Sequence, residues 1–275
     1  MGWLEAVHWE ARGVPAWASL QLLAMAVGLG WFIARTRAQP SLRACLVAGF
    51  VGAVVGGLAL GLALALPAWV ASGFELRALR RAGVVAYGAL GGLVLVYVML
   101  ARRRGVRAGA ALDRLAPILG VLVVFGRAGC YLGGCDHGTV TALPWGVRFA
   151  RRTAAWSEHL RAGLIGPFDD ASLAVHPSQL YEALLGALMI VMVLVLERGR
   201  GASGARRPGV VFALTAALYA AGRIGVEVTR GYGVGLPISS AQILGGLVLV
   251  GAAGWAWRAW TVSAPAPPLR SGAGI

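Results

Sequence analysis

The sequence predicts an all-α polytopic membrane protein of about seven transmembrane helices, with a polar segment between the fourth and fifth. Three observations predict it. The 275 residues have a mean hydropathy of +0.73, and 58% are hydrophobic against 13% charged, a balance too apolar for an ordinary soluble domain. Apolar runs of about twenty residues, the length that an α-helix needs to cross a bilayer, recur along the chain. Arginines gather at the ends of these runs.

The first three predicted spans are residues 14–34, 44–70 and 83–101. Arginines follow the first of them at positions 35, 37 and 43. The second is long and rich in Gly and Ala, with Pro67 and Trp69 near its end. The third is followed by arginines at positions 102–104 and 107. The 41 glycines of the chain are concentrated in such spans, where small residues let helices approach closely in lipid.

The fourth span, residues 110–125, is weaker because Asp113, Arg114 and Pro117 interrupt its first half. A polar segment, residues 126–175, separates it from the fifth span, residues 180–196. Residues 208–228 and 237–257 complete the seven. We expect one transmembrane domain over residues 1–262, followed by a disordered cytoplasmic tail over residues 263–275, which is rich in Pro, Ala and Gly.

The arginine clusters predict the orientation. Those after the first, third and fifth spans lie on one face, which the positive-inside rule makes cytoplasmic. The N-terminus, which we expect to be uncleaved, and the polar segment are then periplasmic. Only the loop with Arg77, Arg80 and Arg81 disagrees. The net charge of +14 comes with 25 basic residues, all arginine, whose placement favours topology and anionic lipid rather than nucleic acid as the partner.

Residues 126–138 gather the groups that carry chemistry: a guanidinium, two thiols, a carboxylate and an imidazole among five glycines. The residues alone leave three interpretations open. Arg127 can hold a phosphate through its bidentate fork. Cys130 and Cys135 can form a periplasmic disulfide. The same two cysteines can bind zinc with His137, with or without His176. Asp136 and His137 can equally be solvated loop residues.

Two further groups of polar residues lie where a bilayer should not tolerate them. In the sixth span, Tyr219, Arg223, Glu227 and Arg230 are spaced four, eight and eleven residues apart, which predicts one helical face. That face can bind an anionic head group, or its Arg–Glu pair can simply tie helices together. The stretch from His176 to Glu182 opens the fifth span, where His176 can cap the helix and Tyr181 can anchor the interface. For Tyr87 packing is the default interpretation.

With these residues in view, the chain resembles the prolipoprotein diacylglyceryl transferases of bacterial inner membranes. Four blocks carry the resemblance: Gly126-Arg127-Ala128-Gly129, Pro144-Trp145-Gly146-Val147, His176-Pro177-Ser178-Gln179-Leu180-Tyr181-Glu182, and the Tyr219, Arg223, Glu227, Arg230 helix with Ser239, Gln242 and Ile243 after it. The resemblance covers most of the chain from about Gly83 onward. It implies transfer of a diacylglyceryl group from phosphatidylglycerol to the lipobox cysteine of a prolipoprotein, which forms a thioether and releases glycerol phosphate.

The resemblance also implies roles for single residues. The catalytic residues it implies are Arg127, Arg223, His176, Glu227 and Tyr87. The substrate-binding residues it implies are Arg127, Gly138, Gln179, Tyr181, Tyr219, Arg230, Cys130 and Cys135. The expected partners are phosphatidylglycerol, prolipoprotein signal peptides and the lipid bilayer, and neither a metal nor a cofactor is expected.

This chain departs from many members of the family at a few of these positions. They have Asn where it has Cys130, another Asn at Gly133, His at Tyr87, and a first-span Tyr where it has Gln21. Its Gly-Cys followed by a second Gly-Cys resembles one branch of the family instead. Two alternatives are therefore a paralogue that acts on another acceptor, and a non-catalytic protein that binds or transports phospholipid.

Overall fold

The computed structural model describes residues 5–6, 10–11, 14–75, 85–198, 208–230 and 239–261, and this part of the chain is mainly helical. Seven helices in it have 18 residues or more: α1 (Ala16–Arg35), α2 (Ser41–Ala71), α4 (Ala86–Arg103), α5 (Ala108–Gly133), α7 (Ser178–Arg198), α8 (Val210–Val228) and α9 (Ser240–Thr261). Five of these, α1, α2, α5, α7 and α8, are long and apolar enough to cross a membrane. The all-α class is therefore confirmed, whereas seven crossings remain a prediction. The expected tail and the loop with Arg77 lie outside the described residues.

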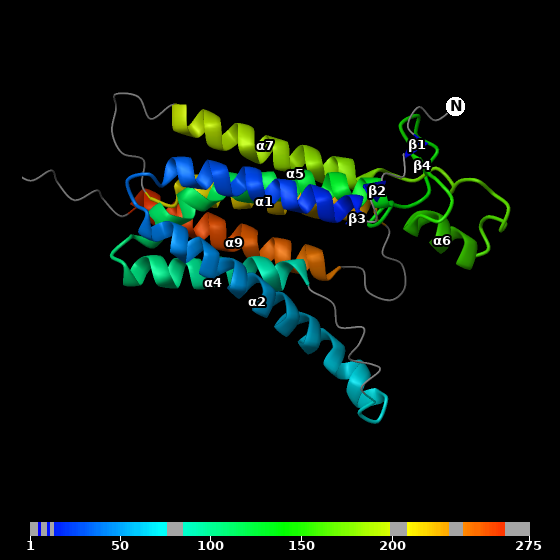
Figure 1. Cartoon of the computed structure of the whole chain (residues 1–275), viewed down its shortest axis with the longest axis horizontal. Coiled ribbons are helices and arrows are strands. Elements are labelled where there is room, and N and C mark those ends of the chain that lie inside the picture. Colours follow the sequence, from blue (N-terminus) through cyan, green and yellow to red (C-terminus); the bar gives the residue numbers. More distant parts are fainter. Residues whose placement is uncertain are drawn as a thin grey trace, which may run out of the picture.

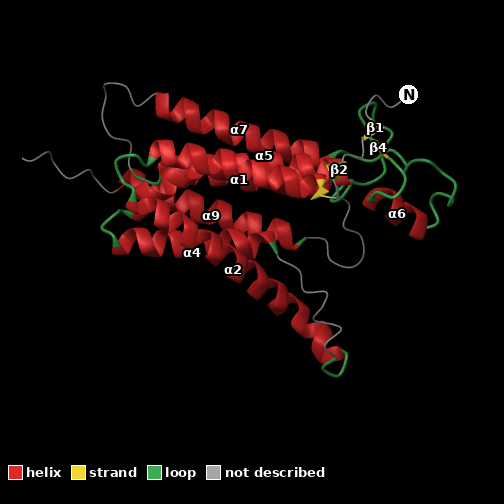
Figure 2. Ribbon diagram, in the orientation of Figure 1, coloured by secondary structure: helices red, strands yellow, loops and turns green. Residues whose placement is uncertain are grey.

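The long helices form a bundle with α5 in the middle (Figures 1 and 2). α5 packs against α1, α4, α7 and α8, while α2 packs on α4 and α9 packs on α8. Figure 1 also shows the end of α2 projecting away from the other helices. Buried apolar residues of α1, α2, α4 and α5 make one core, which includes Phe32, Leu46, Tyr97 and Leu115.

A small head, residues 134–177, lies beyond one end of the bundle (Figure 1). Its elements are the helix α6 (Ala154–Arg161) and the strand β4 (Arg148–Phe149), which pairs in parallel with β1 (Glu5–Ala6). A second strand pair, β2 (Glu10–Ala11) with β3 (Val14–Pro15), is antiparallel. Val147, Phe149, Ala155 and Val175 form the buried core of the head.

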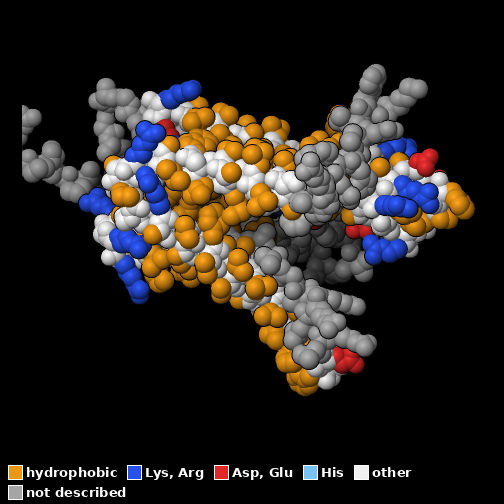
Figure 3. Space-filling model, viewed as in Figure 1, with side chains coloured by type: hydrophobic (Ala, Val, Ile, Leu, Met, Phe, Trp, Pro, Cys, Tyr) orange, Lys and Arg blue, Asp and Glu red, His pale blue; other side chains and the backbone are white. Residues whose placement is uncertain are grey.

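The surface of the bundle separates apolar from basic side chains. Large apolar residues such as Leu22, Val51 and Leu95 are more than half exposed along the helices, as expected for helices that face lipid. Figure 3 shows Arg side chains gathered at the end of the bundle opposite to the head, and again on the head itself. The first group includes exposed Arg37, Arg103 and Arg198. A belt of apolar surface thus lies between two basic ends.

The predicted start of the polar segment at Gly126 is wrong, because α5 continues through Gly133. The helix ends at Gly134, whose φ of 66° is the left-handed conformation that glycine adopts at little cost. The backbone N–H of Cys135 then donates to Cys130 O, and that of Gly134 donates to Tyr131 O, both at 3.1 Å. These two bonds define a Schellman motif, which satisfies the last carbonyls of the helix.

Asp113 does not weaken α5 as its position suggested. Its carboxylate is buried and accepts hydrogen bonds from the backbone N–H groups of Gly209 at 2.8 Å and Phe212 at 2.9 Å, at the start of α8. An aspartate of α5 therefore caps α8, where the partial positive charge of the helix N-terminus favours an anion. The polar residue that interrupted the predicted span is a contact between helices.

Glycines set the distance between α2 and α4. A Cβ atom added at Gly92 would collide with the carbonyl oxygen of Gly52, and one added at Gly52 would lie 2.6 Å from the carbonyl oxygen of Gly92. No side chain fits between backbones this close. Gly91, its neighbour on α4, has nothing within 4 Å of such a Cβ.

We therefore predict that Gly92→Ala lowers the thermal unfolding midpoint of the protein in detergent, whereas Gly91→Ala leaves it unchanged or slightly higher. Overpacking costs about 1–3 kcal/mol, and here the backbone itself would have to move. Equal midpoints for the two variants would contradict the close approach of α2 and α4.

Candidate functional site

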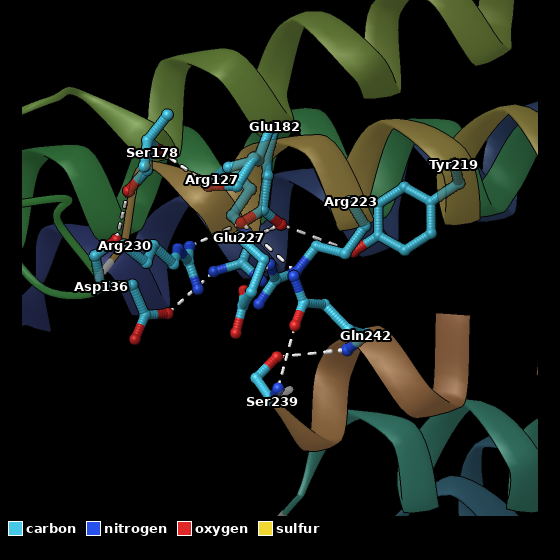
Figure 4. Close-up of polar contacts among 12 residues, drawn as sticks. Arg127, Asp136, Ser178, Glu182, Tyr219, Arg223, Glu227, Arg230, Ser239 and Gln242 are labelled. Carbon is cyan, nitrogen blue, oxygen red and sulfur yellow. Dashed lines mark hydrogen bonds and ion pairs between the residues drawn. The ribbon is translucent and has the colours of Figure 1, made fainter. Parts of the chain in front are cut away.

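One buried carboxylate holds three arginines together at the head end of the bundle (Figure 4). Glu182 of α7 is fully buried, and its Oε2 lies 2.8 Å from Nε of Arg127 on α5. Its Oε1 lies 2.5 Å from Nη2 of Arg230 and 3.6 Å from Nε of Arg223 on α8. A charged group in a low-dielectric site persists only when it is paired, so each of these ions depends on the others.

Glu227 and Asp136 complete this set. Glu227 is buried on α8 and forms an ion pair with Arg223, one turn earlier in the same helix. Asp136, in the loop after α5, accepts a hydrogen bond of 2.8 Å from Nη1 of Arg127. We refer to Arg127, Arg223, Arg230, Glu182, Glu227 and Asp136 as the arginine cluster. Three positive charges face three negative charges, so the cluster is formally neutral.

The carboxylates of the cluster differ in exposure. The Asp136 side chain is 47% exposed, whereas those of Glu182 and Glu227 are 0% and 4% exposed. A solvated carboxylate is held less firmly than a buried one, because water competes for its hydrogen bonds and screens its charge. Arg127, whose side chain is 19% exposed, is thus the arginine that an incoming anion can take from its partner most easily.

Arg230 differs from the predicted arrangement. The spacing placed it on the same helical face as Tyr219, but α8 ends at Val228 and Arg230 lies in the turn that follows. Its backbone N–H still donates to Glu227 O at 3.0 Å. The guanidinium therefore reaches Glu182 from beyond the helix end, while its Nε is buried without a hydrogen-bond partner among the described residues.

Two tyrosines lie in the electrostatic field of the cluster. The hydroxyl of Tyr219 on α8 donates a long hydrogen bond of 3.5 Å to Oε2 of Glu182. Tyr87, near the start of α4, interacts electrostatically with Arg223, Glu227, Glu182 and Arg127. α4 thereby brings a phenol from a fourth part of the sequence toward the same charges. Both tyrosines were singled out from the sequence, and the structure places both with the arginines.

His176, Tyr181 and Trp145, which we refer to as the Trp145 group, form a second polar group beside the first. The indole N–H of Trp145 donates to the hydroxyl oxygen of Tyr181 at 2.8 Å, and that hydroxyl lies 3.3 Å from Nδ1 of His176. Within the described part of the chain, the ring of His176 is bonded to Tyr181 rather than to an arginine. The catalytic role that the resemblance implies for His176 remains a prediction.

The chain between the two groups, residues 135–139, is held by hydrogen bonds from both sides. The Gln179 amide donates to Cys135 O at 2.7 Å, and the Ser178 hydroxyl donates to Asp136 O at 2.6 Å. Gly138 donates its N–H to His176 O at 2.9 Å. A Cβ at Gly138 would lie 2.6 Å from both His176 Cβ and Thr229 O. Gly138 and Gln179 thus have clear structural roles, and contact with substrate remains a prediction for both.

Cys130 and Cys135 are free thiols. In the described residues, no three His, Cys, Asp or Glu side chains come together in a group that could hold a metal ion. The zinc interpretation of residues 126–138 therefore has no support in the geometry. His137 instead lies 3.0 Å from the carboxylate of Glu158 on α6, through its Nε2.

The last helix begins beside the cluster with a capping box (Figure 4). The hydroxyl of Ser239 accepts from the N–H of Gln242 at 3.2 Å, and the Gln242 side-chain oxygen accepts from the N–H of Ser239 at 2.9 Å. This reciprocal pair satisfies two of the free N–H groups at the start of α9. The resemblance pointed to these two residues, and the contacts that they make here cap the helix.

The sequence matches a known family along nearly the whole chain. The profile of the prolipoprotein diacylglyceryl transferases matches residues 7–258. The chain belongs to this family. The matched stretch contains every residue of the arginine cluster and of the Trp145 group.

Individual relatives of the family are moderately similar. The phosphatidylglycerol–prolipoprotein diacylglyceryl transferase of Clostridium tetani is 32% identical over 150 residues, which are 54% of this chain and 52% of that protein. The enzyme of the same name from Tropheryma whipplei is 33% identical over 145 residues, 52% and 48% of the two chains. The one from Phenylobacterium zucineum is 30% identical over 194 residues, 66% and 62% of the two chains. The matches thus span about half to three fifths of these relatives.

Sequence reasoning missed three residues that organise the site of this family member. Glu182 ends the motif that opens the fifth span, but it was not assigned a role. A carboxylate in the first turns of an apolar helix needs a buried cation, and that signal could have found it. Asp136 and Trp145 were also present in quoted motifs. Their contacts with Arg127 and Tyr181 cross 9 and 36 residues of sequence, a pairing that no local pattern indicates.

We predict that Glu182→Gln destabilises the protein by about 3–5 kcal/mol, because it leaves buried arginines without their counter-ion. The matched control is Glu158→Gln, which removes an exposed carboxylate that pairs with His137 and should cost less than about 1 kcal/mol. Thermal unfolding in detergent measures both. A Glu182→Gln variant as stable as the control would contradict the role of Glu182 as the common partner.

Proposed function

We propose that this protein transfers the diacylglyceryl group of phosphatidylglycerol to the lipobox cysteine of prolipoproteins. The observation that carries the proposal is the arginine cluster, which lies at the head end of the apolar bundle in a member of the prolipoprotein diacylglyceryl transferase family. Relatives bear the name of this activity. The lipid is an anion with two acyl chains, and it requires cations at the edge of an apolar surface.

Arg127 is the group that we assign to the lipid phosphate. Its carboxylate partner Asp136 is the exposed one, so a phosphate can replace that partner without unpairing the buried Glu182. Arginine binds phosphate through two parallel N–H donors. Glu182 keeps hold of Arg127 through Nε, which leaves the Nη atoms for the ligand.

The reaction forms one bond and breaks one. The thiolate sulfur of the lipobox cysteine attacks the glycerol carbon that carries the phosphate ester, the carbon–oxygen bond breaks, and glycerol phosphate leaves with the electron pair. Negative charge therefore grows on the leaving phosphate. Arg127 and Arg223 would stabilise that charge, and Arg230, which shares Glu182 with them, would support them.

A base must take the proton of the substrate thiol, since the thiolate is the nucleophile. Glu227, within the cluster, and His176, within the Trp145 group, are our two candidates. Tyr87 and Tyr219 would orient the lipid beside the cluster. Gly138, Gln179, Tyr181, Cys130 and Cys135 would line the substrate site, as the family resemblance implies.

The proposed setting is the bacterial inner membrane, with seven crossings. The exposed arginines at the end opposite to the head support a cytoplasmic position for that end. The head and the arginine cluster are then periplasmic, on the side where a secreted prolipoprotein presents its signal peptide. The N-terminus would be periplasmic and the C-terminus cytoplasmic.

The test is a transfer assay with purified protein, phosphatidylglycerol and a peptide with a lipobox cysteine. We expect release of glycerol phosphate together with a diacylglyceryl gain in peptide mass. Arg223→Ala should lower kcat by about 10²–10³, the loss typical of one donor to a developing anion. Arg103→Ala is the matched control, because it removes an exposed arginine at the opposite end and should leave kcat unchanged.

Glu227→Gln and His176→Gln separate the two candidate bases. The variant that lacks the base should lose about 10²–10⁴ in kcat and also the rise of rate with pH, whereas the other should keep that rise. A wild-type protein that binds phosphatidylglycerol but releases no glycerol phosphate would overturn the transferase and favour a lipid-binding protein.

A further inference from the structure

The Schellman motif at the end of α5 brings two thiols together. Its two hydrogen bonds fold the chain back at Gly134, so that Cys135 returns over Cys130. A contact between the residue after the glycine and the residue four positions before it frequently accompanies this motif. These are the positions of Cys135 and Cys130. The backbone turn at Gly134 thus brings the two residues close together.

The contacts of the two thiols agree with this geometry. Sγ of Cys135 lies 3.5 Å from the carbonyl oxygen of Cys130, to which it donates. Both residues are partly exposed, so a small reagent can reach them. Arg127 lies one turn before Cys130 on the same helix and acts on its sulfur electrostatically.

We propose that Cys130 and Cys135 are a redox-modification site, which a small-molecule or protein disulfide oxidises to an intrachain disulfide. Cys130 loses its proton and its sulfur attacks the reagent disulfide, so that one reagent thiol leaves and a mixed disulfide forms. Cys135 then loses its proton and attacks the Cys130 sulfur, and the second reagent thiol leaves. The two cysteine sulfurs are oxidised and the two reagent sulfurs are reduced.

The order of the two steps follows from the contacts. Cys130 is the first nucleophile, because the Arg127 guanidinium lies one turn before it on the same helix and a nearby cation stabilises a thiolate. The hydrogen bond to Cys130 and burial raise the pKa of the Cys135 thiol. Cys135 therefore stays protonated during the first attack and must lose its proton before the second.

The disulfide would act on the arginine cluster through one peptide unit. Cys135 O accepts the Gln179 amide, and the next residue, Asp136, is the exposed partner of Arg127. A bond between the sulfurs fixes the chain at Cys135 and hence limits the movement of Asp136. The disulfide would therefore restrain the loop beside the groups assigned to the phosphate. Its formation does not depend on the transfer reaction.

The test uses the full-length protein in detergent, incubated with excess glutathione disulfide, quenched with acid and alkylated. Trypsin leaves both cysteines in one peptide, from Ala128 to Arg148, and a further cut after Tyr131 separates them. We expect the two thiols to disappear together and the two halves of the peptide to stay joined until reduction. Cys45, fully buried at the other end of the bundle, is the internal control and should remain a free thiol.

Single variants check the order of attack. Cys135→Ser should accumulate glutathione on Cys130, whereas Cys130→Ser should react much more slowly at Cys135. Three results with the wild-type protein would each overturn the proposal. They are the persistence of both free thiols, a stable glutathione adduct on either cysteine, and a disulfide between two chains. Because the readout is peptide mass, a failed transfer assay would leave the result intact.

A pair of glycine variants tests the geometry itself. Gly134→Ala puts a side chain at a φ of 66° and a Cβ 2.9 Å from Thr153 Cβ, so it should open the motif and slow disulfide formation about tenfold. Gly133→Ala, with nothing within 4 Å of the added Cβ, should oxidise at the wild-type rate. Equal slowing in both variants would contradict a role for the Schellman motif.

Discussion

The site depends on one buried carboxylate. Glu182 has no exposed surface, and it contacts arginines that come from α5, from α8 and from the turn after α8. Desolvation of any of these ions alone would cost several kcal/mol, and only their mutual attraction offsets it. The interaction therefore fixes more than local charge. It requires α5, α7 and α8 to meet at one height in the bundle, and it sets the spacing of the guanidinium groups before any anion arrives.

The rest of the molecule supports this meeting point in different ways. Glycine contacts let α2 and α4 approach closely, and α4 carries Tyr87 toward the cluster. The loop of residues 135–139 is hydrogen-bonded to the start of α7 and to Thr229, at the end of α8, which joins the head to the bundle. Packing in the apolar span thus sets where the helices lie, while polar contacts at its edge set where the charges lie. The two tasks fall to different residues.

Much of this could be predicted from the sequence. Hydropathy predicted the all-α class and the seven runs that the structure shows as helices. Spacing on one helix brought together Tyr219, Arg223 and Glu227, because a 3.6-residue period is a local property. Contacts between distant segments could not be derived in this way. No periodicity in the sequence indicates that Glu182 pairs with Arg127 or that Trp145 pairs with Tyr181. Each contact follows from how whole segments pack. The end of α5 was misplaced for a related reason, since the glycines of residues 126–134 read as loop although only Gly134 ends the helix.

The cap that Asp113 places on α8 has a consequence for how the protein responds to its lipid surroundings. α8 is fastened to α5 at its start by Asp113 and near its end through Glu182, which holds Arg127 and Arg223 together. A helix held at both ends cannot slide along its neighbour when the bilayer becomes thinner or thicker. Hydrophobic mismatch would then be absorbed by tilting the two helices as one body. The separation of Arg127 and Arg223 would stay constant among membranes of different thickness.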